Sequence, residues 1–326
     1  MRPGHRRLLA AALALTAMLP FFPATEAQHA DLPRIGFLGW ADGECSDESL
    51  VAGLAELGLR QGETVIIECR TAGSDDAGLA PAAAELVKLG VDLIVTTSQP
   101  AGRAAHQVTT TVPIVTGLSG DPVAGGLAQS LARPGGNVTG VSYYTTELSA
   151  KRLELLKEAM PGIDTVDVLS NPVVSYLPFE EDTRKAAVQL GVRIRIHSVR
   201  KPADLDRAFA AMQADRAEAV FVLPDLMLAH EAPRIARLAI AQRLPTMTWG
   251  SWFTEAGCLM SYSARYDQIN HRLAYYVDRI LHGAAAGDLP IEQPTTFSLS
   301  INLRTAKAIG VEMPETILLL ADNVIE

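Results

Sequence analysis

The sequence predicts an α/β protein made of two halves of similar build, each a parallel sheet flanked by helices. Short β-rich runs alternate with helical periodicity of about ten to fifteen residues, which is the pattern of βαβ units. The alternation restarts past the middle of the chain, and no low-complexity linker separates the halves. A length of 326 residues fits about two domains, and 48% hydrophobic residues can fill large cores.

In the first half, the predicted helices carry start or stop signals. Ser46 is a favourable N-cap for a helix with Leu50 and Leu54 on one face. An alanine-rich helix stops at Gly90, and another ends before Pro134. We expect helices over 46–59, 79–89, 101–109 and 123–132, and strands over 34–38, 64–68, 91–96, 113–116 and 138–143.

The second half repeats this alternation from a hinge near 144–147. Leu148, Leu155 and Leu156 give its first helix an apolar face. We expect helices over 147–160, 179–190, 204–214 and 230–242, and strands over 165–169, 193–197, 219–223 and 246–249.

The tail predicts chain crossings between the halves, because another strand and helix follow the second half before a proline-rich stretch at 288–294. Strands are expected over 258–263 and 296–303, and helices over 267–281 and 305–309. We assign 31–144 plus 255–286 to an N-terminal lobe, and 145–252 plus 294–326 to a C-terminal lobe. Several crossings make a multi-strand hinge, which suits a cleft that opens and closes.

Residues 1–27 have the layout of a cleavable secretory signal. Three arginines precede an apolar run over 8–22, and the small residues Thr25 and Ala27 predict cleavage near Ala27. An uncleaved membrane anchor is the alternative, but the run is shorter than the ~20 residues that span a bilayer. The mature protein is expected outside the cytoplasm.

Charge and cysteine content exclude several classes of protein. Lys+Arg number 28 against 37 Asp+Glu, a net charge of −9, which argues against a nucleic-acid partner. Three cysteines exclude a disulfide-built scaffold and a multi-cysteine zinc domain. Cys45 and Cys69 lie near the ends of the first two strands and can form a bridge, which would leave Cys258 as a buried thiol.

The carboxyl ends of the strands supply the candidate ligand-binding residues, because ligands of open α/β sheets bind there. Amide, hydroxyl, carboxylate and aromatic groups suit a small polar or aromatic molecule. In a zwitterion, Asp121 or Asp225 would take the ammonium, and serine hydroxyls with backbone N–H groups the carboxylate. The candidates are Gly39, Trp40, Ser98, Gln99, Ser119, Asp121, Tyr143, Asn171, Asp225 and Trp249.

Each candidate also has a purely structural interpretation. The serines and aspartates can cap helices, and Asn171 before Pro172 can shape a turn. Trp249 can pack in the hinge, and at most one of Tyr143 and Tyr144 should face a cleft because they alternate along a strand.

Motifs of known catalytic sites are missing from the sequence. Residues 117–121 lack the second glycine of a GxSxG elbow, and no dinucleotide or P-loop glycine motif is present. No histidine or cysteine spacing indicates zinc. We therefore expect no enzyme, no cofactor and no metal site.

Several stretches resemble the ABC transporter substrate-binding protein family of the tryptophan/tyrosine-uptake type. They are Ser119–Val123, Leu131–Gly140, Glu147–Lys157, Asn171–Pro172, Leu223–Asp225, Leu259–Tyr262, Leu289–Phe297 and Asn302–Lys307, and the likeness runs from about Pro33 to Glu326. The resemblance implies a type I periplasmic-binding-protein fold with two Rossmann-like lobes. It implicates Ser98, Ser119, Asp121, Asn171 and Asp225 at the lobe interface, whereas Gly39–Ser49 departs from the family pattern.

The function implied by this resemblance is that of the periplasmic solute-binding component of an ABC importer. Such a protein holds an amino acid, an aromatic one in some members, or a related small organic acid between its lobes. Its partners would be an inner-membrane permease and a separate ATPase, and we expect a monomer. A ligand-sensing ectodomain that reports to a membrane signalling protein is the alternative, and a secreted enzyme is a third class.

Overall fold

The computed structural model describes residues 32–326 apart from 43, 45–46, 119–120, 144–145 and 173–178. Residues 33–326 cluster into one unit. The predicted signal peptide, residues 1–27, lies outside the described residues. Within the described part of the chain, every helix is too short or too polar to cross a membrane.

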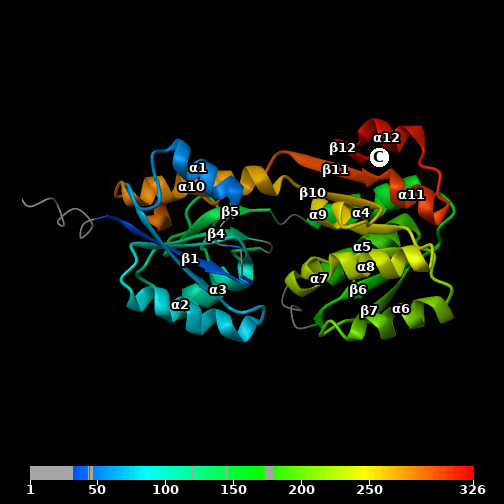
Figure 1. The fold of residues 1–326 in the computed structure, drawn as a ribbon, viewed down its shortest axis with the longest axis horizontal. Coiled ribbons are helices and arrows are strands. Elements are labelled where there is room, and N and C mark those ends of the chain that lie inside the picture. The colour runs from blue at the N-terminus through cyan, green and yellow to red at the C-terminus, as the bar shows by residue number, and fades with distance from the viewer. Residues whose placement is uncertain (1–31, 43, 45–46, 119–120, 144–145, 173–178) are drawn as a thin grey trace, which may run out of the picture. The chain divides into compact units, whose positions relative to one another are not determined.

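The first sheet has five parallel strands in the order β2-β1-β3-β4-β5 (Figure 1). Side chains alternate along β1 (Arg34–Gly39), so that Ile35 and Phe37 enter one hydrophobic core and Leu38 the other. The remaining strands are β2 (Ile66–Thr71), β3 (Leu93–Thr96), β4 (Ile114–Leu118) and β5 (Val138–Ser142).

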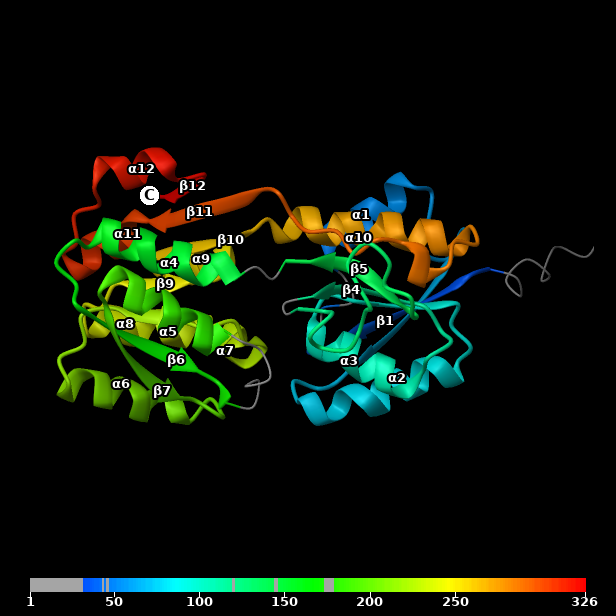
Figure 2. The ribbon, with the colours of Figure 1, turned by 180° about the vertical axis from the view of Figure 1, so that it is seen from behind.

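Two pairs of helices cover this sheet, one on each face (Figures 1 and 2). α1 (Glu48–Glu56) and α10 (Tyr266–Leu281) pack on the face of Ile35 and Phe37. α2 (Leu79–Lys88) and α3 (Gln99–Val108) pack on the other face. The N-cap of α1 is Asp47, whose Oδ1 accepts a hydrogen bond from the Leu50 N–H at 2.9 Å, whereas the sequence predicted Ser46.

The second sheet has seven strands in the order β12-β11-β10-β9-β8-β6-β7, and β11 runs antiparallel to β10. Val220 and Val222 of β8 enter one core and Phe221 enters the other, the pattern of a strand covered on both faces. The strands are β6 (Thr165–Ser170), β7 (Arg193–Ser198), β8 (Val220–Val222), β9 (Thr246–Thr248), β10 (Met260–Ala264), β11 (Phe297–Asn302) and β12 (Asn323–Ile325).

The helices of the second sheet divide between its two cores. One core takes side chains from α4 (Thr146–Ala159), α5 (Phe179–Leu190), α11 (Leu303–Ile309) and α12 (Glu315–Leu320). The other takes side chains from α6 (Asp204–Ala214), α7 (Leu226–His230), α8 (Ala232–Ala241) and α9 (Ser251–Glu255). The described part of the chain also contains the 3₁₀ turns η2 (Asp76–Gly78) and η4 (Ala286–Asp288).

The strand pairing differs from the expected division at one boundary. The sequence assigned 255–286 to the N-terminal lobe, but β10 pairs with β9 and β11 in the second sheet. Within 255–286, α10, which begins at Tyr266, and Ala286 of η4 pack on the first sheet. Because β10 is hydrogen-bonded to β9, the chain leaves the second sheet after β10 and not before it.

The predicted helix over 123–132 is wrong, because this stretch forms turns. Asp121 Oδ1 accepts hydrogen bonds from the N–H groups of Val123 and Ala124 at 2.8 and 3.1 Å. Gly126 then adopts a φ of +72°, which a right-handed helix does not allow. The helix predicted over 230–242 is also interrupted at Glu231, between α7 and α8.

Candidate functional site

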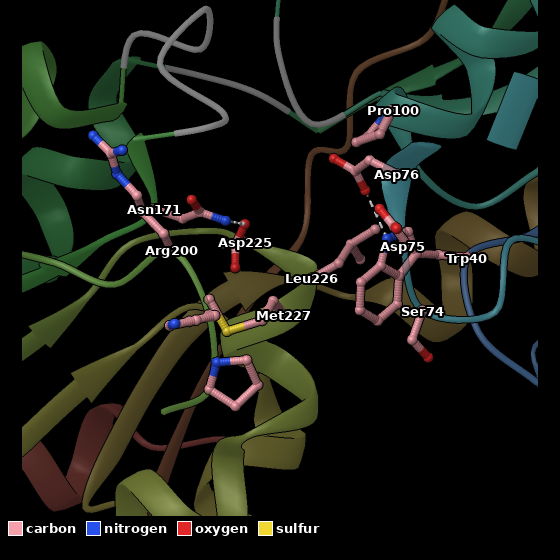
Figure 3. Close-up of a pocket in the computed structure, with 12 residues that line it drawn as sticks. Trp40, Ser74, Asp75, Asp76, Pro100, Asn171, Arg200, Asp225, Leu226 and Met227 are labelled. Carbon is pink, nitrogen blue, oxygen red and sulfur yellow. Dashed lines mark hydrogen bonds between the residues drawn. The ribbon is translucent and has the colours of Figure 1, made fainter. Parts of the chain in front are cut away.

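A cavity of about 360 Å³ lies at the carboxyl ends of strands from both sheets (Figure 3). Its walls come from the loops after β1, β2, β6, β7 and β8 and from the start of α3. This is the edge where open parallel sheets bind ligands. The lining residues are Trp40, Ser74, Asp75, Asp76, Pro100, Asn171, Arg200, Lys201, Pro202, Asp225, Leu226 and Met227.

Asn171 and Asp225 form the most buried polar pair of this cavity. Each is only 9% exposed, and Asn171 Nδ2 donates a hydrogen bond to Asp225 Oδ2 at 2.9 Å. Asp225 is also the N-cap of α7, and its Oδ1 accepts from the Leu228 N–H at 2.8 Å. The cap and the amide fix the direction of the carboxylate while leaving lone pairs for a further donor.

Burial raises the pKa of the Asp225 carboxyl, although the Leu228 N–H and the Asn171 amide oppose this. The negative charge of Asp76, from the opposite wall, raises the pKa further. Both effects mean that a carboxylate is disfavoured here without a cation. A ligand ammonium would supply that cation.

Trp40 forms an aromatic wall whose orientation is fixed by hydrogen bonds. Its indole Nε1 donates to Asp76 Oδ1 at 2.6 Å, and its backbone N–H donates to Glu44 Oε2 at 2.8 Å. Its ring lies 4.8 Å from that of His230, centroid to centroid, at an interplanar angle of 40°. Because the indole donor is used by Asp76, Trp40 can offer a ligand only its π-surface.

The cavity carries both signs of charge. Asp75 and Asp76 contribute carboxylates at the end of β2, and Arg200 and Lys201 contribute cations after β7. These four residues are exposed, in contrast to Asp225. The exposed charges form the rim, and the Asn171–Asp225 pair supplies a buried polar contact.

The structure thus brings three sequence-predicted residues, Trp40, Asn171 and Asp225, into one cavity. Gly39 directly precedes Trp40 as the buried last residue of β1. Asp121 is exposed, and its side chain accepts a hydrogen bond within a turn. This role agrees with the structural interpretation of Asp121 rather than with ligand binding. Ser119 lies outside the described residues.

Ser98 and Gln99 lie at the start of α3, next to Pro100 of the cavity wall. Ser98 occupies the N-cap position but makes no side-chain capping bond. Both side chains are buried, and Ser98 Oγ and Gln99 Oε1 have no hydrogen-bond partner among the described residues. Both atoms can therefore accept a further hydrogen bond.

Tyr143 and Trp249 belong instead to a cluster of aromatic rings. Tyr266 packs edge-on against Tyr143 at 5.1 Å and against Trp252 at 5.0 Å, measured between centroids. Trp249 lies 5.0 Å from Trp252 and 6.2 Å from Tyr266. Packing in this cluster agrees with the structural interpretation of Trp249, but its Nε1 is buried without a described partner.

The candidate set drawn from the sequence missed nine of the twelve residues that line the cavity. Residues 74–76 follow β2 and residues 200–202 follow β7, and the ends of these two strands were not among the candidates. The same strand-end rule, applied to them, finds all six residues. Leu226 and Met227, the first residues of α7, had no comparable signal.

The cysteines divide into two kinds. Cys69 is disulfide-bonded, and Cys258 is a buried free thiol. Cys45 lies outside the described residues, so the Cys45–Cys69 pairing stays a prediction. Among the described residues, no group of histidine, cysteine, aspartate or glutamate side chains could hold a metal ion.

Comparison with known proteins gives consistent results. The profile of the family described as "ABC transporter substrate binding protein" matches residues 46–325. A tyrosine-binding protein of Clostridioides difficile (strain R20291) is 24% identical over 278 residues, which cover 85% of this chain and 78% of that protein.

Two crystal structures have the same fold. One is an ABC domain in complex with L-Trp from Streptococcus pneumonia, with a TM-score of 0.82 and 24% identity over 90% of this chain and 100% of that one. The other is a conserved domain protein of Vibrio cholerae O1 biovar El Tor, with a TM-score of 0.83 and 26% identity over 90% and 99%.

Proposed function

The chain belongs to the ABC transporter substrate-binding protein family, and from this premise we propose that it holds an amino acid, preferably an aromatic one, for import. The family resemblance and the type I periplasmic-binding-protein fold expected from the sequence are confirmed. Proteins of this family are substrate-binding proteins and not enzymes, as expected.

The observation that carries the proposal is the buried Asn171–Asp225 pair in a cavity built from strand ends of both sheets. A buried carboxylate without a cation is costly, and an α-ammonium group would neutralise it. The indole of Trp40 offers an apolar surface on the opposite wall. Relatives that bind tyrosine or L-Trp support an aromatic side chain as the rest of the ligand.

The remaining parts of the function are proposed as a consequence of this assignment. The ligand would be trapped when the two lobes close on it, and the closed form would be recognised by an inner-membrane permease coupled to a separate ATPase. The protein would act as a periplasmic monomer after cleavage of residues 1–27. Its family membership supports these steps.

A thermal-shift screen tests the proposal. Protein freed of co-purified molecules by unfolding and refolding is heated with each of the twenty amino acids. A ligand at 100 times its Kd stabilises the folded state by about 2.7 kcal/mol, so a true ligand raises the Tm by several degrees. We expect the largest rise with L-tryptophan or L-tyrosine. A folded protein whose Tm no amino acid raises would contradict the proposal.

A further inference from the structure

α7 is a short helix whose side chains reach hydrophobic cores of both sheets. Leu228 is fully buried in a core of the second sheet. Leu226 instead packs against the core of the first sheet that contains Trp40, and Figure 3 shows it extending toward Trp40. Met227 packs against both cores. The helix is therefore anchored on the second sheet and also packs on the first.

His230, the last residue of α7, lies against the indole of Trp40. The two ring centroids are 4.8 Å apart, and the rings are tilted by 40°. Trp40 is only 5% exposed, whereas His230 is exposed, so the imidazole covers a ring that Asp76 already holds through its indole N–H. Because Trp40 follows β1 and His230 ends α7, this ring contact joins the two sheets at the cavity.

Glu44 adds a charge to this contact. Its carboxylate oxygens accept hydrogen bonds from the backbone N–H groups of Trp40 and Ala41, at 2.8 and 3.3 Å. Burial raises the pKa of Glu44, although these two N–H groups and a positive charge on His230 oppose this. The carboxylate and the imidazole are therefore close enough to interact, and the loop after β1 meets α7 through both a ring contact and a charge.

The same helix carries the proposed ammonium site. Asp225 is the N-cap of α7 and lines the cavity, and His230 lies at the other end of the helix. If the two walls of the cavity move apart, Asp225 moves with α7 and His230 leaves Trp40. A contact that exists only while the walls are together stabilises the closed form, and the release of a ligand depends on that stability.

We infer that His230 is a positioning residue that holds the cavity closed on its ligand by packing on Trp40, with Leu226 and Met227 as the apolar part of the same contact. The inference rests on the proposed function and names the contact that controls release from that site. A capping role alone, in which the charge of His230 favours the carboxyl end of α7, would not require a ring of the first sheet beside it. His230 is not among the residues that line the cavity, so it acts through Trp40.

The release of L-tryptophan or L-tyrosine, whichever binds, tests this contact. Stopped-flow fluorescence after rapid dilution of the complex measures the rate. We expect His230→Ala to release the amino acid about 2- to 10-fold faster than the wild type, the contribution of one aromatic contact to the closed form. His230→Phe keeps a ring on the indole and should stay within about twofold of the wild type. Equal rates for His230→Ala and the wild type would overturn the inference and leave the proposed function standing.

Small-angle X-ray scattering of the ligand-free protein examines the contact without an amino acid. His230→Ala should have a larger radius of gyration than the wild type, because the open form is more extended, and His230→Phe should not. Where an amino acid binds, the release rate decides. If the folded wild type binds neither amino acid, scattering decides, and an unchanged radius of gyration in His230→Ala would overturn the contact. The proposed function itself is wrong if the folded wild type binds no amino acid.

Two further variants separate closure from folding. His282→Ala removes an exposed histidine whose partner, Asp278, lies on α10 itself, and it should change neither the release rate nor the radius of gyration. His230→Gln also lacks the ring and should release the amino acid as fast as His230→Ala. Because His230 is exposed, both of its ring-free variants should melt within a few degrees of the wild type. A much lower Tm with an unchanged release rate would leave His230 a helix cap and overturn the inference.

Discussion

Asn171 and Asp225 meet at 2.9 Å in the cavity, and their hydrogen bond joins the loop after β6 to the N-cap of α7. The two residues are 54 positions apart in the sequence and are both 9% exposed. Because burial raises the pKa of Asp225, the carboxylate is strained electrostatically without a cation beside it. The same pair that orders the wall thus favours a positively charged ligand group.

Asp225→Asn removes this charge and keeps the size of the side chain. We predict that its affinity for L-tryptophan falls roughly 10- to 100-fold, since a hydrogen bond to a charged group contributes about 1.5–3 kcal/mol. Its affinity for indole-3-propionate, which has no ammonium, should stay within a few-fold. Calorimetry measures both. Asp206→Asn, an exposed carboxylate paired with Arg234, is the control and should change neither affinity.

Two substitutions of Trp40 compare how much its hydrogen bond and its ring contribute to stability. The side chain is 5% exposed and donates to Asp76, whose own side chain is exposed. Trp40→Phe loses the hydrogen bond and part of the buried ring volume, so we expect a fall of about 1–2 kcal/mol in the free energy of unfolding. Trp40→Ala empties a buried volume and should cost about 3–5 kcal/mol. Urea denaturation measures both, and equal values would contradict the account.

The environment of Asp167 in the second sheet indicates that the stability of the protein falls at low pH. It is fully buried and accepts hydrogen bonds from His197 Nε2 at 2.6 Å and from Arg195 at 3.0 and 2.6 Å. Burial would raise the pKa of Asp167, but these hydrogen bonds and positive charges outweigh it and lower the pKa. The resulting stabilisation is complete above the unfolded pKa of about 4 and is lost as the pH falls through the lower folded value.

Asp167→Asn is therefore expected to destabilise the protein by roughly 3–5 kcal/mol at pH 7, with a difference that shrinks as the pH falls below about 4. Denaturant titrations at several pH values measure this difference. Glu181→Gln, which removes an exposed ion pair with Lys185, should leave stability nearly unchanged. A loss from Asp167→Asn that is equal at pH 3 and pH 7 would rule out this coupling.

The cysteines predict a defined labelling pattern. Burial raises the pKa of the Cys258 thiol to about 12, so the thiolate is nearly absent at pH 8 and the native protein should resist alkylation. After unfolding without reductant, one thiol per chain should react, and after reduction all three should react. Mass spectrometry counts the labels. Three labels without reductant would show that Cys45 and Cys69 are not bridged.

The order of elements follows from the sequence because each strand and helix has a local signal. Short runs of apolar, β-prone residues identify β1 and β8, and helical periodicity identifies α4. Local signals failed at two places for different reasons. At 123–132, Gly126 adopts a positive φ, and the predicted helix is replaced by turns. The assignment of β10 to the second sheet depends on its pairing with β11, which a local signal does not show.

The site was predictable only in the part that follows from strand ends. Trp40, Asn171 and Asp225 were found by that rule, and Asp76 and Arg200 can be found by it. The buried indole nitrogens of Trp249 and Trp252, which have no described partner, were not predictable, because a sequence does not show which buried donors find an acceptor.

The most direct test of the account is calorimetric titration of L-tryptophan and L-tyrosine into wild-type protein that has been freed of co-purified molecules by unfolding and refolding. We predict saturable binding of one molecule per chain for at least one of the two amino acids, weakened by Asp225→Asn and unaffected by Asp206→Asn. The absence of heat with both amino acids, from a sample whose circular dichroism and cooperative melting show that it is folded, would contradict it.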